Sequence, residues 1–158
     1  TLQMVKDDTP DRLKALLGRM LEDAEKLFID TGRLAMWTEG HPSSLALQVA
    51  MDREAEFHDG LQAAVFVSPV MTFGQNSFDY DPAWIDPQLP VLIARGEEDS
   101  FYEVKASVKM FRQAAEEAGS EVTYLEVAGG NHNWMTERDT DASHQAIKAE
   151  IEFLRKHL

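Results

Sequence analysis

The chain has 158 residues, no cysteine and a formal net charge of −13. The lack of cysteine excludes a disulfide framework and a thiolate metal site, and the negative charge disfavours nucleic acid and anionic membranes as partners. No apolar run approaches the length of a membrane span and no signal peptide is recognisable, so we expect one soluble domain over residues 1–158, with a cytoplasmic location favoured.

The first part of the chain predicts a helix, a strand, a sharp turn and a second helix. Thr9-Pro10-Asp11 is a typical helix start, and apolar residues at helical spacing continue to about Phe28. Leu34–Trp37 is then expected to form a short buried strand. The chain turns tightly over Thr38–Pro42 and continues as a helix over Ser43–Arg53.

The rest of the chain alternates apolar runs with amphipathic stretches. It predicts strands at Ala63–Val67, Leu89–Ala94 and Val122–Val127, a long loop or small cap over Pro69–Pro87, a helix over Tyr102–Ala118 that Gly119 ends, and a last helix from Asp141 with Ala146, Ile147, Ile151 and Leu154 facing inward. Strands that alternate with helices predict an α/β fold with a mostly parallel sheet of about four strands.

In such a sheet the carboxyl ends of the strands meet at one edge, where ligands bind. The segments at Gly40, Ser68, Asp99 and His132 all follow predicted strands. Asp99 and His132 are the most informative pair, because a carboxylate held against a histidine fixes its tautomer and stabilises its charged form. The alternative is that Asp99 only caps the following helix and that His132 is a surface loop residue.

The order of these motifs resembles the C-terminal half of an α/β-hydrolase of the esterase/lipase or prolyl-peptidase-like kind. Pro90–Asp99 is similar to the family's strand and acid, Ala114–Tyr124 to the helix and strand that follow, and Gly129-Gly130-Asn131-His132 to its histidine loop. The resemblance implies a hydrolase of small esters or amides with Asp99 and His132 as catalytic residues. It implies no cofactor.

The resemblance also implies a nucleophile elbow, G-x-S-x-G, between a strand and a helix. Thr38-Glu39-Gly40-His41-Pro42 occupies that place, so Gly40 stands where the serine is expected and both flanking glycines are changed. Three serines and the first residue are the other candidate nucleophiles: Ser43, Ser44, Ser68 and Thr1. The chain is therefore expected to be either a hydrolase with a degenerate triad or a non-catalytic hydrolase-like subunit or binding module.

The predicted strands match only the later four of the family's sheet, which has about eight strands. The chain is thus expected to be the C-terminal part of a larger fold, with an exposed sheet edge at Leu34–Trp37 or at its neighbouring strand. We expect a second chain, the missing N-terminal half or self-association to cover that edge.

Two other kinds of site find little support in the sequence. The remaining histidines, His41, His58, His144 and His157, lack the spacing of a zinc site. Four aromatic residues of the long loop could line an apolar pocket or, as we favour, anchor the loop on the core: Phe73, Phe78, Tyr80 and Trp84.

Overall fold

The computed structural model describes residues 9–71, 80–137 and 139–158. Four strands form a single parallel sheet in the order β1-β2-β3-β4. They are β1 (Leu34–Glu39), β2 (Leu61–Val67), β3 (Val91–Gly96) and β4 (Val122–Val127). The predicted fold class and the number of strands are confirmed.

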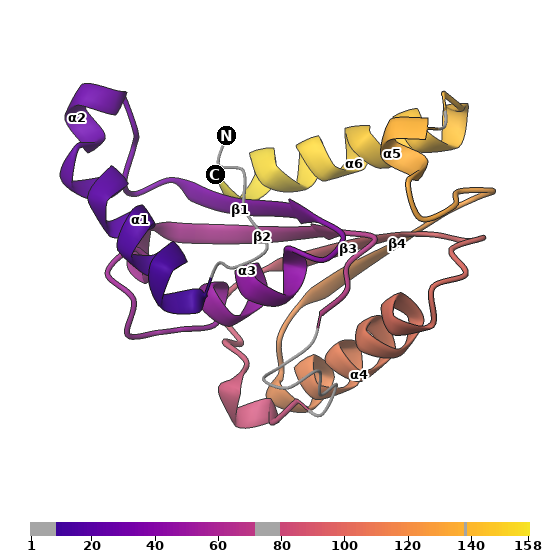
Figure 1. The fold of residues 1–158 in the computed structure, drawn as a ribbon, viewed down its shortest axis with the longest axis horizontal. Coiled ribbons are helices and arrows are strands. Elements are labelled where there is room, and N and C mark those ends of the chain that lie inside the picture. The colour runs from indigo at the N-terminus through magenta and orange to yellow at the C-terminus, as the bar shows by residue number, and fades with distance from the viewer. Residues whose placement is uncertain (1–8, 72–79, 138) are drawn as a thin grey trace.

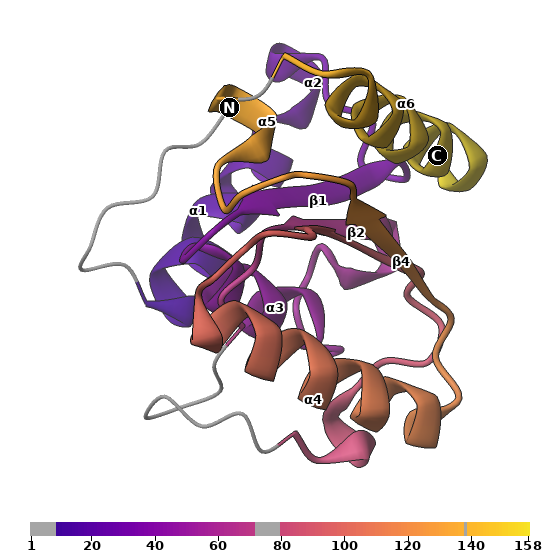
Figure 2. The same ribbon diagram turned by 90° about the vertical axis from the view of Figure 1, so that its right-hand side faces the viewer.

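Helices cover both faces of this sheet (Figures 1 and 2). The helix α6 (Asp141–His157) lies on one face, whereas α3 (Ser43–Ala50) and α4 (Tyr102–Ala118) lie on the other. The remaining helical segments are α1 (Pro10–Glu22), α2 (Ala24–Leu27), α5 (Trp134–Glu137) and the 3-10 turns η1 (His58–Gly60) and η2 (Pro82–Trp84).

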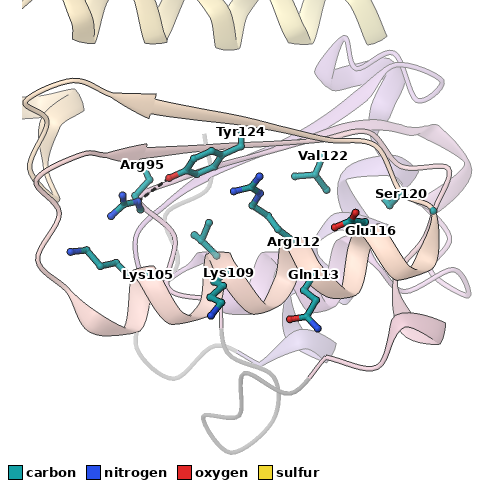
Figure 3. Close-up of a pocket in the computed structure, with 11 residues that line it drawn as sticks. Arg95, Lys105, Lys109, Arg112, Gln113, Glu116, Ser120, Val122 and Tyr124 are labelled. Atoms are coloured by element: carbon teal, nitrogen blue, oxygen red, sulfur yellow. Dashed lines mark hydrogen bonds between the residues drawn. The ribbon is translucent and has the colours of Figure 1, made fainter.

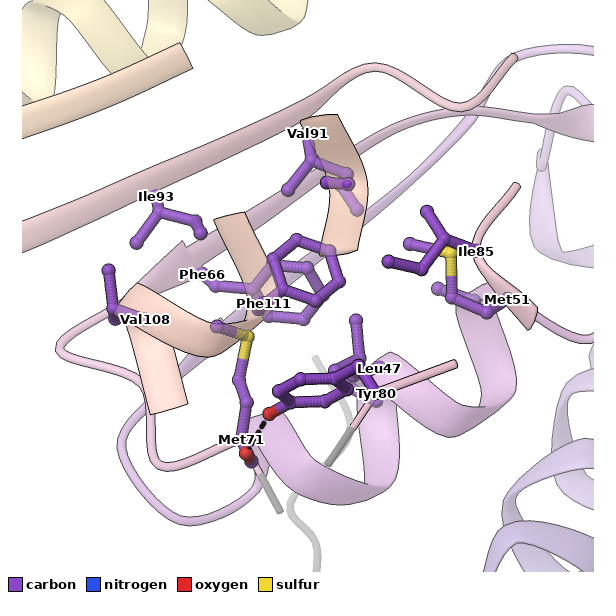
Figure 4. Packing of buried hydrophobic residues seen from close by; sticks show 14 of the residues in the cluster. Leu47, Met51, Phe66, Met71, Tyr80, Ile85, Val91, Ile93, Val108 and Phe111 are labelled. Atoms are coloured by element: carbon purple, nitrogen blue, oxygen red, sulfur yellow. Dashed lines mark hydrogen bonds between the residues drawn. The ribbon is translucent and has the colours of Figure 1, made fainter. Parts of the chain in front are cut away.

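The hydrophobic core is divided by the sheet into two layers, because side chains of a strand alternate between its faces. Phe66 and Ile93 point towards α3 and α4 and pack with Phe111 (Figure 4). Val65 and Leu92 point the other way, towards Trp134 and α6. The two central strands β2 and β3 are almost entirely buried, which explains their near-continuous apolar sequence.

The first predicted helix is interrupted earlier than its apolar pattern suggests. Asp23 leaves helical geometry, and the chain resumes as the single turn α2, which Phe28 closes in the left-handed conformation. Phe28 is 96% exposed, so the apolar spacing continues beyond the residues that pack on the core. The turn at 30–32 is held by the Asp30 carboxylate, which accepts from the Gly32 amide.

Two more predicted boundaries differ for local reasons. The helix from Ser43 ends at Ala50 instead of Arg53, since the Asp52 carboxylate accepts hydrogen bonds from the Glu54 amide and the Lys14 ammonium. Strand β1 extends to Glu39 and is only partly buried, because it forms the edge of the described sheet. The predicted strand at 34–37 is present and lies at the edge of the described sheet, but the prediction that it is buried was wrong.

The last two helical segments bring one addition and one correction. The short helix α5 was not predicted, and it carries the fully buried Trp134. On α6 the inward positions are Ala146, Glu150 and Phe153, whereas Ile151 is exposed. Of the four residues predicted to face inward, Ala146 is buried and Ile147 and Leu154 pack against the same core cluster, whereas the prediction for Ile151 was wrong.

Candidate active site

Asp99 and His132 lie together at the carboxyl ends of β3 and β4. The Nδ1 atom of His132 is 2.9 Å from Oδ2 of Asp99, and the Asp99 side chain is fully buried. Since an ionised carboxylate can only accept, the hydrogen of the neutral imidazole resides on Nδ1. The Nε2 atom is then left with a free lone pair, which is the state of a general base.

The second oxygen of Asp99 has a structural partner of its own. Oδ1 accepts the backbone N–H of Phe101 at 3.0 Å, so Asp99 contacts the residue that precedes α4 as well as His132. The ring of Phe101 also packs on the imidazole of His132, with 4.4 Å between centroids. The carboxylate is thereby fixed in position, and one side of the histidine ring is covered.

The loops that carry these two residues approach each other through glycines. A Cβ atom on Gly96 would lie 2.3 Å from the Gly130 oxygen, so no other residue fits without moving the backbone. The Glu98 amide donates to the same Gly130 oxygen at 2.8 Å. Gly96 is therefore a positioning residue that sequence reasoning missed; the signal was a glycine directly after a buried strand and before the acid.

Gly40 lies close to the imidazole of His132. Its φ is +67°, in the left-handed region that favours glycine. A Cβ atom built on Gly40 would be 4.0 Å from Nε2 of His132. The residue that the sequence places at the elbow is thus the one whose side chain would face the histidine.

The backbone around Gly40 holds the turn tightly. The Gly40 amide donates to the Val67 oxygen at 2.9 Å, and its own oxygen accepts from the amides of Ser43 and Val70, both at 3.2 Å. His41 follows Gly40 and is exposed. These hydrogen bonds fix the turn between β1 and α3.

The other candidate hydroxyls have different roles. Ser43 is fully buried and shares a 3.0 Å hydrogen bond with Thr38, while Ser44 donates to the Val70 oxygen at 2.6 Å. Ser68 is also fully buried, has φ +41° and has no hydrogen-bond partner for its Oγ among the described residues. Thr1 lies outside the described residues.

Of the aromatic loop residues, Tyr80 and Trp84 stack at 6.5 Å between centroids. Tyr80 also contacts Phe111 edge-on and donates to the Met71 oxygen, which fits an anchoring role. Burial raises the pKa of the Tyr80 hydroxyl. Phe73 and Phe78 lie outside the described residues.

Two carboxylates near the site have altered proton affinities. Burial raises the pKa of Glu39, and a positive charge on the nearby His132, when that ring is protonated, opposes the rise. Glu150 is only 3% exposed and accepts from the Trp37 indole at 3.1 Å. Burial raises its pKa to about 7, against the effect of this hydrogen bond, and the charge of Glu39 adds to the rise.

A second aspartate–histidine pair offers an internal comparison. His58 and Asp86 are joined at 3.0 Å, but His58 precedes β2, so this pair lies at the amino end of that strand. Across residues 9–71, 80–137 and 139–158, no three histidine or acidic side chains are placed to hold a metal ion. No helix in the same ranges is long and apolar enough to span a bilayer.

Solved structures of esterases share this architecture. An esterase of the fungus Rhizomucor miehei matches with a TM-score of 0.79 at 17% identity, over 98% of this chain and 62% of its own. A thermostable esterase of Pseudomonas putida matches with a TM-score of 0.79 at 15% identity, over 94% of this chain and 59% of the esterase. Carboxyl esterase 2 of Tuber melanosporum matches with a TM-score of 0.79 at 12% identity, over 99% of this chain and 66% of the esterase.

No protein-family model matches the sequence, and no curated protein matches it. The chain spans about three fifths of the length of the first two esterases and about two thirds of the third. The likeness therefore concerns the fold, and it extends over nearly all of this chain. The chain has part of an α/β-hydrolase fold.

Proposed function

We propose that this chain is the part of an α/β-hydrolase-type protein that supplies the catalytic acid and histidine. The protein would be related to carboxylic-ester or amide hydrolases, with a triad that lacks its serine. The observation that carries the proposal is the Asp99–His132 pair, whose free Nε2 faces the backbone of Gly40. The second pair, His58–Asp86, also has a buried carboxylate but lies at the other end of the sheet. The acid–base role is therefore supported by the position of Asp99–His132 beside Gly40, and not by burial of the carboxylate alone.

In the reaction, Nε2 of His132 would take the proton of an attacking hydroxyl and then return it to the leaving alcohol or amine. Asp99 would stabilise the imidazolium formed between these steps. The backbone N–H of His41 follows the elbow, at the position that donates to the oxyanion in such folds. Gly40 supplies no nucleophile, so the hydroxyl would come from another residue or another chain.

Turnover of a p-nitrophenyl ester tests this role. We expect the His132→Ala variant to lose about 100-fold or more of any activity, which is the contribution of a general base. His58→Ala is the matched control, because it removes an aspartate-paired histidine at the other end of the sheet. Equal rates in the wild type and His132→Ala would refute the proposed role of His132.

The second candidate is a non-catalytic hydrolase-like subunit or binding module. It is favoured by the replacement of all three defining elbow positions by Thr38, Gly40 and Pro42, since a chain without catalytic demand can relax a strained turn. A fluorophosphonate probe separates the two candidates. Covalent labelling of a serine or threonine in the unmodified chain would rule out the non-catalytic one.

Our proposal about partners rests on the edge strand β1. Trp37 on this strand is 44% exposed, and β1 has a hydrogen-bonded neighbour only on the β2 side among the described residues. Such an edge pairs readily with another strand. The cover would be a second copy, a separate chain or a further segment of a longer protein.

Light scattering tests for a second copy, and we expect the chain to form dimers or larger species. Ala35→Lys places a charge on the exposed edge and should shift the chain towards monomers, whereas Ala128→Lys, on an exposed loop, should not. A monomeric wild-type chain would exclude self-association. Slow deuterium exchange at all β1 amides of such a monomer would contradict the need for any cover.

A further inference from the structure

A groove of about 810 Å³ lies between β4 and α4 (Figure 3). None of its lining residues belongs to the Asp99–His132 site. Four cationic side chains line it, and the acids at or beside it are Glu116 and Glu126. The groove thus has an excess of two positive charges on a chain whose net charge is −13. Its lining cations are Arg95, Lys105, Lys109 and Arg112.

Arg95 is the most constrained of these cations. Its side chain is 11% exposed, with Nε donating to the Tyr124 hydroxyl at 3.0 Å and Nη2 to Glu126 at 2.6 Å. The Nη1 group is buried and has no acceptor among the described residues. A buried guanidinium donor without an acceptor costs free energy. An anion oxygen supplied by a ligand would give Arg95 its missing hydrogen-bond acceptor.

Arg112 joins Arg95 through the same aromatic ring. Its guanidinium carbon lies 4.4 Å from the centroid of Tyr124, whose hydroxyl accepts from Arg95. One guanidinium is thereby held over the face of the ring and the other at its hydroxyl end. Figure 3 shows the side chain of Arg112 rising from α4 towards Tyr124.

The lysines extend this charge along α4. Lys105, Lys109 and Arg112 are spaced by four and three residues, which places them on one side of the helix. Within the described ranges neither lysine has a carboxylate within ion-pair distance. Neither lysine is held in an ion pair as Lys14 and Lys26 are, and the charge of Lys105 also acts on Glu126, where it helps to lower the pKa of that carboxyl.

We propose that this groove binds the phosphoryl group of a small phosphorylated molecule. A phosphoryl dianion matches the excess of two positive charges, and the planar fork of an arginine matches phosphate oxygens with two parallel hydrogen bonds. A carboxylate would carry only half of that charge. A long polyanion would meet repulsion from the rest of this acidic chain. The site is independent of the proposed hydrolase chemistry.

Titration of the full chain with inorganic phosphate, followed by amide chemical shifts at constant ionic strength, tests the proposal. We expect saturable shifts centred on Arg95, Arg112 and Tyr124. The double variant Lys109→Gln/Arg112→Gln should bind at least tenfold more weakly. The matched control Lys148→Gln/Arg155→Gln removes two exposed charges from α6 and should bind like the wild type.

Further ligands define the chemistry. Glycerol phosphate that binds more tightly than phosphate would identify a phosphate monoester as the ligand, and equal affinities would identify free phosphate; both support the site. Acetate that binds as tightly as phosphate would overturn the phosphoryl assignment. No saturable shift, or equal weakening in both double variants, would overturn the site itself.

Discussion

Replacing Gly40 by serine is expected to create a serine that reacts with a fluorophosphonate probe. The Cβ atom at this position points at Nε2 of His132 from 4.0 Å, so the added hydroxyl comes within reach of the base. Removing the base in Gly40→Ser/His132→Ala should slow labelling by about 100-fold or more. The measurement is the labelling rate by intact mass, with circular dichroism to verify folding.

Gly40→Ala is the matched control for this experiment. It introduces the same unfavourable φ of +67°, at a cost of roughly 1–2 kcal/mol, but adds no hydroxyl. If a folded Gly40→Ser variant reacts no faster than Gly40→Ala, the turn is unable to activate a nucleophile. The non-catalytic alternative would then be the better description of this chain.

Glu150→Gln is expected to stabilise the chain in alkaline but not in acidic solution. The pKa of Glu150 is raised from 4.5 to about 7 in the folded chain, chiefly by burial. Between these values the folded state binds a proton that the unfolded state has released, so wild-type stability falls as the pH rises through this window. The Glu150→Gln variant has no carboxyl group to ionise at this position, so its stability does not fall in this window. At pH 8 the variant should be more stable by roughly 2–3 kcal/mol.

Urea denaturation at pH 4 and pH 8 measures this difference. The glutamine side-chain oxygen can still accept from the Trp37 indole, so the variant keeps the one hydrogen bond that the Glu150 carboxylate makes to a side chain. Glu152→Gln is the control, because Glu152 lies two residues further along the same helix and is exposed. The interpretation fails if Glu150→Gln and Glu152→Gln change stability equally at both pH values.

The long elements of the second half were predictable because each carries its own boundary signals. Helix α4 occupies the predicted range Tyr102–Ala118, and Gly119 closes it with φ +76°. Strand β4 occupies the predicted Val122–Val127, and α6 begins at the predicted Asp141, with Thr140 as its capping residue. Glycine ends, capping hydroxyls and regular apolar spacing are local features, so the sequence suffices to locate them.

Burial was less predictable, since it depends on what an element packs against. The composition of Leu34–Trp37 predicted a buried strand, whereas the resemblance implied a sheet edge there, and β1 is an edge strand in the described sheet. Ile151 fits the apolar period of α6 but is exposed, whereas the acidic Glu150 beside it is buried. An inner strand and an edge strand can have the same apolar pattern, so the order of strands in the sheet is needed to distinguish them.

The sequence by itself determined the class of fold and the order of strands and helices along the chain. It also determined which residues follow the strands and so lie at the carboxyl edge of the sheet. The tertiary structure decided that Asp99 and His132 form a hydrogen bond and that Gly40 is opposite Nε2. The reason is that loops separated by 33 residues or more meet only when the parallel strands pair in register. The glycine at Gly96 then allows their backbones to approach closely enough.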